Sequence, residues 1–193
     1  MKVLLINGSP RPKGCTYTAL SEIAKVLEME RIETEIFQVG SKPIRGCTAC
    51  KSCTTLDRCI FDDDPVNIAL EKVKDFDGFV FGSPVHYGGA SGHIKSLLDR
   101  MFYASRDSFA NKPGTAIVSC RRAGATAALD QLNKYLTGCG MPVVSSQYWN
   151  MVHGNTPDEV REDLEGMQTM RTLGRNMAWL LKCIQAGKEA GIR

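Results

Sequence analysis

Four of the chain's eight cysteines are crowded into one short segment. Cys47, Cys50, Cys53 and Cys59 follow the pattern C-x2-C-x2-C-x5-C. Four thiolates with such short spacers can enclose a 4Fe-4S cluster, because the loop can wrap around the cubane. The same residues can bind one Zn²⁺ ion, or they can form a metal-free loop of packed or redox-active cysteines. The spacing leaves these alternatives open, and we take the four cysteines as candidate metal ligands.

A second group of reactive side chains lies between Gly8 and Thr16, where the sequence reads GSPRPKGCT. This segment follows an apolar run and precedes a helical pattern, so we expect it at a helix N-terminus, where free N–H groups attract phosphate. Ser9 and Thr16 add hydroxyl donors, and Arg11 and Lys13 add positive charge. An ordinary turn with a helix cap is the alternative. The sequence contains neither a P-loop nor a G-x-G-x-x-G fingerprint, which argues against the commonest nucleotide motifs.

Two further loops are expected at the same edge of the molecule as this phosphate loop. Residues 83–92 (SPVHYGGASG) and 119–124 (SCRRAG) each follow a buried, strand-like run. The carboxyl ends of parallel strands share one edge of a sheet, and ligands bind there at the topological switch point. The first of these two loops could lay its backbone and an aromatic ring along a flat ring system. The three loops together predict one ligand site.

The elements that must position these loops alternate along the chain between buried apolar runs and segments of helical periodicity. The expected strands are Lys2–Asn7, Glu33–Val39, Gly78–Gly82, Gly114–Cys120 and Met141–Tyr148, and the expected helices are 16–30, 65–74, 91–103, 126–137 and a single helix over 157–187. This alternation predicts the α/β class, with a parallel sheet covered on both faces. We expect one domain over residues 1–193, with a cysteine-rich loop insertion at about 40–61, since loops of that length usually carry function.

Composition excludes several classes of protein. The net charge is only +3 and no block of lysine and arginine occurs, so we expect no nucleic-acid partner. No apolar run approaches the roughly 20 residues that span a bilayer, so we expect no membrane association. The N-terminal apolar stretch is too short for a signal peptide, which predicts a cytoplasmic protein.

The phosphate loop and residues 82–100 (GSPVHYGGASGHIKSLLDR) resemble the two FMN-binding signatures of the NADPH-dependent FMN reductase family. The resemblance implies a flavodoxin-like three-layer sandwich with a five-stranded parallel sheet in the order 2-1-3-4-5. It assigns the phosphate to Ser9, Arg11, Cys15 and Thr16, one side of the isoalloxazine ring to Pro84, Val85, His86, Tyr87 and Gly88, and the other side to Ser119 and Gly124. Many relatives have tyrosine where His86 stands, so stacking on the ring and an exposed loop histidine remain alternatives for this side chain.

The cysteine pattern is similar to that of the iron–sulfur flavoproteins, which share this fold. The similarity implies a 4Fe-4S cluster near FMN that passes one electron at a time. The two resemblances together imply an enzyme in which NADPH or NADH reduces FMN, and FMN passes electrons to a small-molecule acceptor or to the cluster. Two alternatives stay open: an electron carrier that receives electrons from ferredoxin, and a non-enzymatic flavodoxin-like FMN-binding module. Relatives commonly assemble, so we expect a homodimer or homotetramer.

Overall fold

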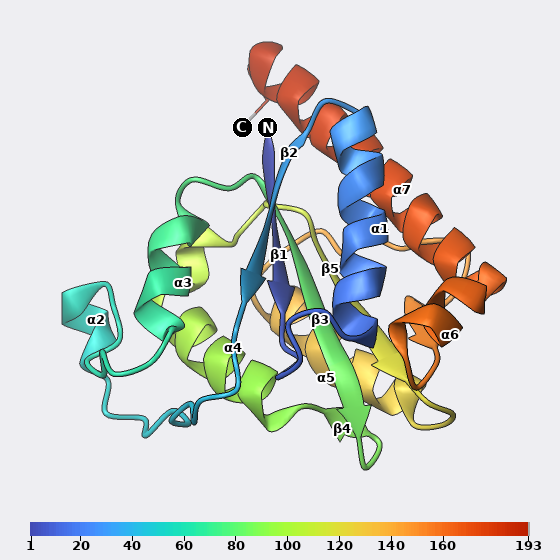
Figure 1. The fold of residues 1–193 in the computed structure, drawn as a ribbon. Coiled ribbons are helices and arrows are strands. Elements are labelled where there is room, and N and C mark those ends of the chain that lie inside the picture. Colours follow the sequence, from blue (N-terminus) through green and yellow to red (C-terminus); the bar gives the residue numbers. More distant parts are fainter. Residues whose placement is uncertain (193) are drawn as a thin grey trace.

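A computed structural model describes residues 1–192 and has three layers, with helices on both faces of a central sheet (Figure 1). The parallel strands run in the order β2-β1-β3-β5-β6, which confirms the predicted flavodoxin-like order. The strands are β1 (Lys2–Asn7), β2 (Glu33–Gln38), β3 (Gly78–His86), β4 (Gly89–Ala90), β5 (Gly114–Cys120) and β6 (Met151–His153). The helices are α1 (Cys15–Met29), α2 (Cys53–Leu56), α3 (Val66–Val73), α4 (Gly92–Ala104), the 3-10 turn Arg106–Ser108, α5 (Ala125–Gly138), α6 (Pro157–Glu162) and α7 (Leu164–Glu189).

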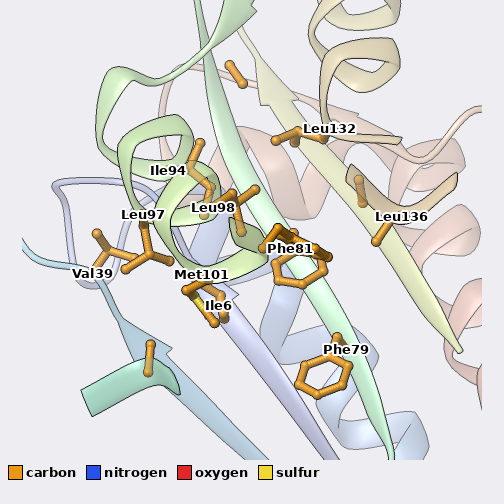
Figure 2. Packing of buried hydrophobic residues seen from close by; sticks show 14 of the residues in the cluster. Ile6, Val39, Phe79, Phe81, Ile94, Leu97, Leu98, Met101, Leu132 and Leu136 are labelled. Carbon is orange, nitrogen blue, oxygen red and sulfur yellow. The ribbon is translucent and has the colours of Figure 1, made fainter. Parts of the chain in front are cut away.

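Helices bury both faces of the sheet and create two hydrophobic cores. One core contains side chains of β1, such as Val3 and Leu5, together with residues of α1 and α7. The other lies against α3, α4 and α5, and Figure 2 shows Ile6 and Phe81 of adjacent strands packed beside α4. Successive side chains of a strand point to opposite faces. The continuous apolar runs in the sequence therefore supply both cores at once and fix the strands in the middle layer.

The expected strand at 141–148 is wrong, because the chain leaves the sheet within this segment. Val143 makes only an isolated bridge to β5, and the last strand, β6, forms further along the chain. The Ser146 hydroxyl donates to the Tyr148 carbonyl at 2.7 Å, and it lies 2.8 Å from the Asn150 side-chain oxygen. Such local side-chain hydrogen bonds compete with the strand ladder. They hold residues 145–150 in a detour outside the sheet.

The single helix expected over 157–187 is also wrong, because Asp163 divides it into α6 and α7. The Asp163 carboxylate accepts the Gly166 N–H at 3.0 Å and caps α7, and it also accepts the His153 N–H at 2.7 Å. The Asp163 backbone (φ −72°, ψ 79°) is not helical, so α6 ends there, and the Asp163 side chain caps the first turn of α7. Helix α7 is 26 residues long, yet no helix among residues 1–192 has a stretch that is both long and apolar enough to cross a membrane.

Strand β3 extends to His86, beyond the end expected at Gly82. It then turns back into β4, with Val85 paired to Ala90. The two turn residues between these strands have positive φ angles, 50° and 74°, as a tight two-residue hairpin requires. The loop after the third expected strand is therefore a short β-hairpin that projects from the carboxyl edge.

Candidate functional site

The first loop and the hairpin loop meet at the carboxyl ends of β1 and β3, where Asn7 pairs in register with Gly82. The Gly8 N–H donates to the Gly82 carbonyl at 2.8 Å, and the Ser91 hydroxyl donates to the Gly8 carbonyl at 2.8 Å. A Cβ at Gly8 would stand 2.5 Å from the Cβ of Ile94. Only glycine allows this approach of loop and helix α4, so Gly8 joins the two loops into one edge.

A cavity of about 450 Å³ opens at this edge, a volume typical of small-molecule sites. Eight of the residues assigned to FMN line it: Ser9, Arg11, Cys15, Thr16, Pro84, Val85, His86 and Ser119. They come from three loops that are far apart in the sequence. The structure thus brings most of the expected cofactor residues together, and their roles toward FMN remain predictions.

Two buried hydroxyl groups form the floor of the cavity. The Thr16 and Ser119 hydroxyl oxygens lie 2.8 Å apart, which links the start of α1 to the end of β5. Ser9 is also buried, and its hydroxyl accepts the Arg11 N–H at 3.2 Å. The Arg11 side chain remains exposed at the rim. Hydroxyl donors, one arginine and a helix N-terminus make this end of the cavity suited to a phosphate group.

Two residues that the sequence reasoning did not assign, Asn7 and Gln38, shape the first loop. They pair in register at the ends of β1 and β2, and the Asn7 amide donates to the Gln38 side-chain oxygen at 2.6 Å. The Ser9 N–H donates to the Asn7 side-chain oxygen at 3.2 Å, and the Gln38 amide donates to the Ser9 carbonyl at 2.7 Å. Ser9 is therefore fixed from both sides by strand-end amides. The available signal was their position, since each is a polar residue at the carboxyl end of a predicted strand.

Three residues that the family resemblance assigns to FMN do not line the cavity: Tyr87, Gly88 and Gly124. Tyr87 is at the tip of the hairpin and is fully exposed. Gly124 has a φ of 84°, and a Cβ there would lie 2.7 Å from the Gly88 Cα. The two glycines therefore allow the hairpin loop to pack closely against the loop after β5. This contact fixes the spacing of the two loops that border the cavity.

A further wall of the cavity comes from residues that the resemblance left unassigned, Cys120, Arg121, Gly154 and Asn155, and Pro10 of the first loop also lines the cavity. The Cys15 thiol lies 3.7 Å from the Gly154 carbonyl and joins this wall to the first loop. Burial raises the pKa of the thiols of Cys15 and Cys120. Both are therefore protonated near neutral pH and contribute small, uncharged surfaces to the cavity.

A second cavity, of about 420 Å³, lies between the cysteine segment and helix α4. All four candidate ligands line it, namely Cys47, Cys50, Cys53 and Cys59. Cys59 is buried, Cys53 is half-buried, and the other two thiols are exposed. The structure therefore places the four cysteines of the sequence pattern around one space.

The spacing of these thiols can be compared with the needs of two kinds of metal site. Among residues 1–192, no three histidine, cysteine or acidic side chains lie close enough together to share a metal ion. A tetrahedral Zn²⁺ site needs four ligands at about 2.0–2.3 Å from one atom. A 4Fe-4S cubane distributes its thiolates over separate irons and so requires a wider ring. The cavity lining is compatible with a cluster, with zinc and with a metal-free loop, and the choice between them is left to the proposal below.

Comparisons with known proteins identify the family of this chain. The NADPH-dependent FMN reductase family profile matches residues 1–156. An iron-sulfur flavoprotein of Methanocaldococcus jannaschii is 34% identical over 194 residues, covering 96% of this chain and 100% of the relative. An iron-sulfur flavoprotein of Archaeoglobus fulgidus is 32% identical over 191 residues, covering 92% of this chain and 95% of the relative. A solved flavodoxin from the domain Archaea has a TM-score of 0.63 at 16% identity, covering 94% of this chain and 99% of that one. This chain therefore belongs to the NADPH-dependent FMN reductase family of flavin-dependent oxidoreductases and has the flavodoxin-like fold.

Proposed function

We propose that the protein binds FMN in the cavity at the sheet edge and a 4Fe-4S cluster in the cavity lined by the cysteines. NADPH or NADH would reduce the flavin, and electrons would leave to a small-molecule acceptor or to the cluster. The observation that carries this proposal is the convergence of eight FMN-assigned residues on one cavity. The relatives named iron-sulfur flavoproteins, similar over nearly the whole chain, support the second group.

The chain's own residues would bind and orient the flavin. Ser9 and Thr16 would donate hydroxyl hydrogen bonds to the phosphate, and Arg11 would supply charge at the rim. The extended segment Pro84–His86 offers one side of the cavity to the ring, and the wall around Cys120 offers another. Bound FMN supplies the hydride and electron chemistry, so no protein acid or base is required for the transfer itself.

The composition of the bound cofactors tests this proposal. Protein purified without oxygen should show flavin absorbance together with a broad brown absorbance, and about four irons per chain. Cys59→Ser should lose iron and keep FMN, because Cys59 lines only the second cavity. Cys183→Ser is the matched control, since Cys183 is exposed on α7, away from both cavities. Background iron after anaerobic reconstitution of the parent would refute the cluster, and failure to bind FMN would refute the proposal as a whole.

The electron donor needs a separate kinetic test. Stopped-flow reduction with NADPH, NADH or reduced ferredoxin measures which donor reduces the flavin within a turnover. We expect a pyridine nucleotide to act directly, because the family whose profile matches the chain is described as NADPH-dependent. Reduction by ferredoxin alone would identify the protein as an electron carrier.

The electron-carrier alternative is favoured by one observation, the exposure of Cys47 and Cys50. A cluster bound by these residues would lie close to the surface, where a partner protein can exchange electrons with it. Under this alternative, ferredoxin would reduce the cluster before the flavin. The order in which cluster and flavin absorbance bleach after mixing with ferredoxin would distinguish the two paths.

A further inference from the structure

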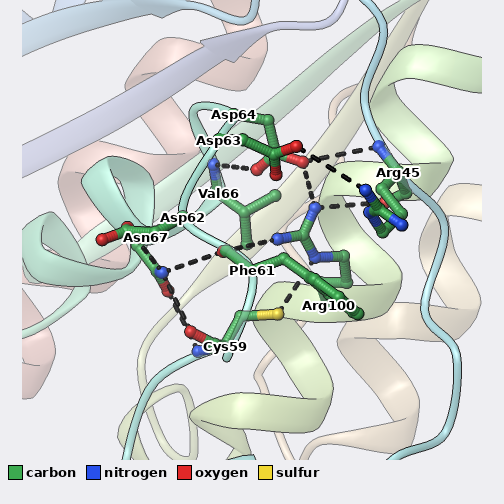
Figure 3. A network of polar contacts seen from close by, with 9 residues as sticks. All are labelled: Arg45, Cys59, Phe61, Asp62, Asp63, Asp64, Val66, Asn67 and Arg100. Atoms are coloured by element: carbon green, nitrogen blue, oxygen red, sulfur yellow. Dashed lines mark hydrogen bonds and ion pairs between the residues drawn. The ribbon is translucent and has the colours of Figure 1, made fainter.

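Arg100 of helix α4 is almost completely buried beside the cysteine segment, with 2% of its surface exposed. Its Nε donates to the Sγ of Cys59 at 3.2 Å (Figure 3). The Nη atoms donate to the Arg45 carbonyl at 3.2 Å and to the Phe61 carbonyl at 2.9 Å, and one of them pairs with the Asp64 carboxylate. One guanidinium thus contacts a thiol, two backbone carbonyls and a carboxylate.

These contacts connect both ends of the cysteine segment to one point on α4. Arg45 precedes the first cysteine, and Phe61 follows the last. Residues 45–51 and 54–58 are exposed, and other contacts of this part of the chain lie at the surface, such as the Asp57–Lys74 ion pair and the Cys53 thiol 3.8 Å from the Tyr103 carbonyl. Arg100 therefore joins both ends of the segment, through buried contacts, to the helix that forms the other wall of the cavity.

Cys59 is held from its backbone as well as from its thiol. The side chain of Asn67 accepts the Cys59 N–H at 3.0 Å and donates to the Cys59 carbonyl at 3.0 Å. The same amide donates to the Phe61 carbonyl at 3.1 Å. Among the four cysteines, Cys59 is the buried one. It is therefore an oriented thiol before any cofactor binds.

A buried arginine is costly, and its role here is better explained by orientation than by stability. Transferring both charges of an arginine–carboxylate pair out of water costs about as much as their attraction returns. A planar guanidinium, however, presents its five donors in fixed directions, which a lysine cannot reproduce. A hydrogen bond to a cluster sulfur also raises the reduction potential of an iron–sulfur centre, because it stabilises the more negative, reduced state.

We propose that Arg100 is a positioning residue that orients Cys59 as the pre-formed ligand of the cluster and raises the cluster's reduction potential through its Nε–H bond to that sulfur. This inference rests on the proposed function, because it assumes that the four cysteines bind a cluster. The potential is then set in part by a side chain of α4, outside the cysteine pattern itself.

The decisive measurement is the midpoint reduction potential of the cluster in the Arg100→Lys holoprotein, followed by spectroelectrochemical titration. The substitution keeps the positive charge and removes the Nε–H bond to sulfur. We expect the potential to fall by about 59 mV, which is a tenfold change in the one-electron reduction constant. Iron per chain should also fall, and the flavin content should stay at the parent level.

Arg45→Gln is the matched control. Its side chain is exposed and stacks 4.5 Å from the Phe61 ring centroid, so the substitution removes a nearby charge and leaves the hydrogen bond to Cys59 intact. We expect the parent potential in this variant. An equal shift in Arg45→Gln and Arg100→Lys would overturn the inference, since the shift would then not depend on the Nε–H bond to Cys59.

If circular dichroism shows that Arg100→Lys is misfolded, a second variant replaces it in the test. Arg100→Met combined with Asp64→Leu removes both buried charges together, a change that proteins often tolerate. It should show the same fall in potential and faster proteolysis within residues 45–61. A parent that binds no iron refutes the proposed function and this inference with it. A loaded parent with unchanged potential in both variants overturns the inference alone.

Discussion

Removing the Ser9 and Thr16 hydroxyls together should weaken FMN binding by about two to three orders of magnitude. A hydrogen bond to a charged group contributes about 1.5–3 kcal/mol, so two such bonds amount to about 3–6 kcal/mol. Each 1.4 kcal/mol is about tenfold in Kd, which gives about 10²- to 10⁴-fold. The Ser119 hydroxyl lies 2.8 Å from that of Thr16 and can replace part of the second contact, so the lower half of the range is expected.

The assay is a titration of FMN with the apo-protein, followed by quenching of flavin fluorescence. Thr18→Ala is the matched control, because Thr18 lies in the same helix, is buried, and directs its hydroxyl to the Gly14 carbonyl at 3.2 Å instead of the cavity. The control should bind FMN with nearly the parent affinity. A Kd for Ser9→Ala/Thr16→Ala within threefold of the parent would refute the assignment of the phosphate to this loop.

Two further perturbations test the packing and chemistry of the same edge. Gly8→Ala should lower stability by about 1–3 kcal/mol, the usual cost of overpacking, because its Cβ would stand 2.5 Å from that of Ile94; unchanged thermal unfolding would show that the edge can relax. Cys120 should react with iodoacetamide at pH 7 far more slowly than the exposed Cys183. Burial raises the pKa of the Cys120 thiol, so little reactive thiolate is present at pH values below that pKa. The reaction rate of Cys120 should therefore rise as the pH approaches its pKa. Peptide mass spectrometry measures both rates, and equal rates would contradict the buried position of Cys120.

The parts of the fold that the sequence predicted well are those with strong local patterns. The run Lys2–Asn7, its glycine and the helix that follows are specified by residues next to one another, and they form β1, the loop and α1. The last strand was misplaced because residues 141–148 have strand-like composition, whereas hydrogen bonds of Ser146 hold the chain outside the sheet. Strand propensity cannot predict this outcome, because whether a segment joins the edge of a sheet depends on the tertiary contacts available there.

The parts of the two candidate sites that the sequence did not predict depend on contacts between residues far apart in the chain. Asn7 and Gln38 act on the first loop only because β1 and β2 pair in one register. Arg100 looks like an ordinary polar residue of an amphipathic helix, and its partner Asp64 is 36 positions away in the sequence. A cysteine pattern predicts the metal ligands, but it cannot identify a side chain that hydrogen-bonds to one of them.

The exposed cysteine segment has a consequence for the order in which the protein matures. Regions with few buried contacts open locally at much lower free energy than the core, and residues 46–51 and 54–58 are exposed while both cores of the sheet lie elsewhere. In Figure 1 this segment, with α2, projects from the side of the layered body. Under the proposed function, the layered domain can therefore fold before the cysteine segment binds its cluster. The same proposal implies that a cluster lost to oxygen can be rebuilt on the folded molecule, without degradation and new synthesis.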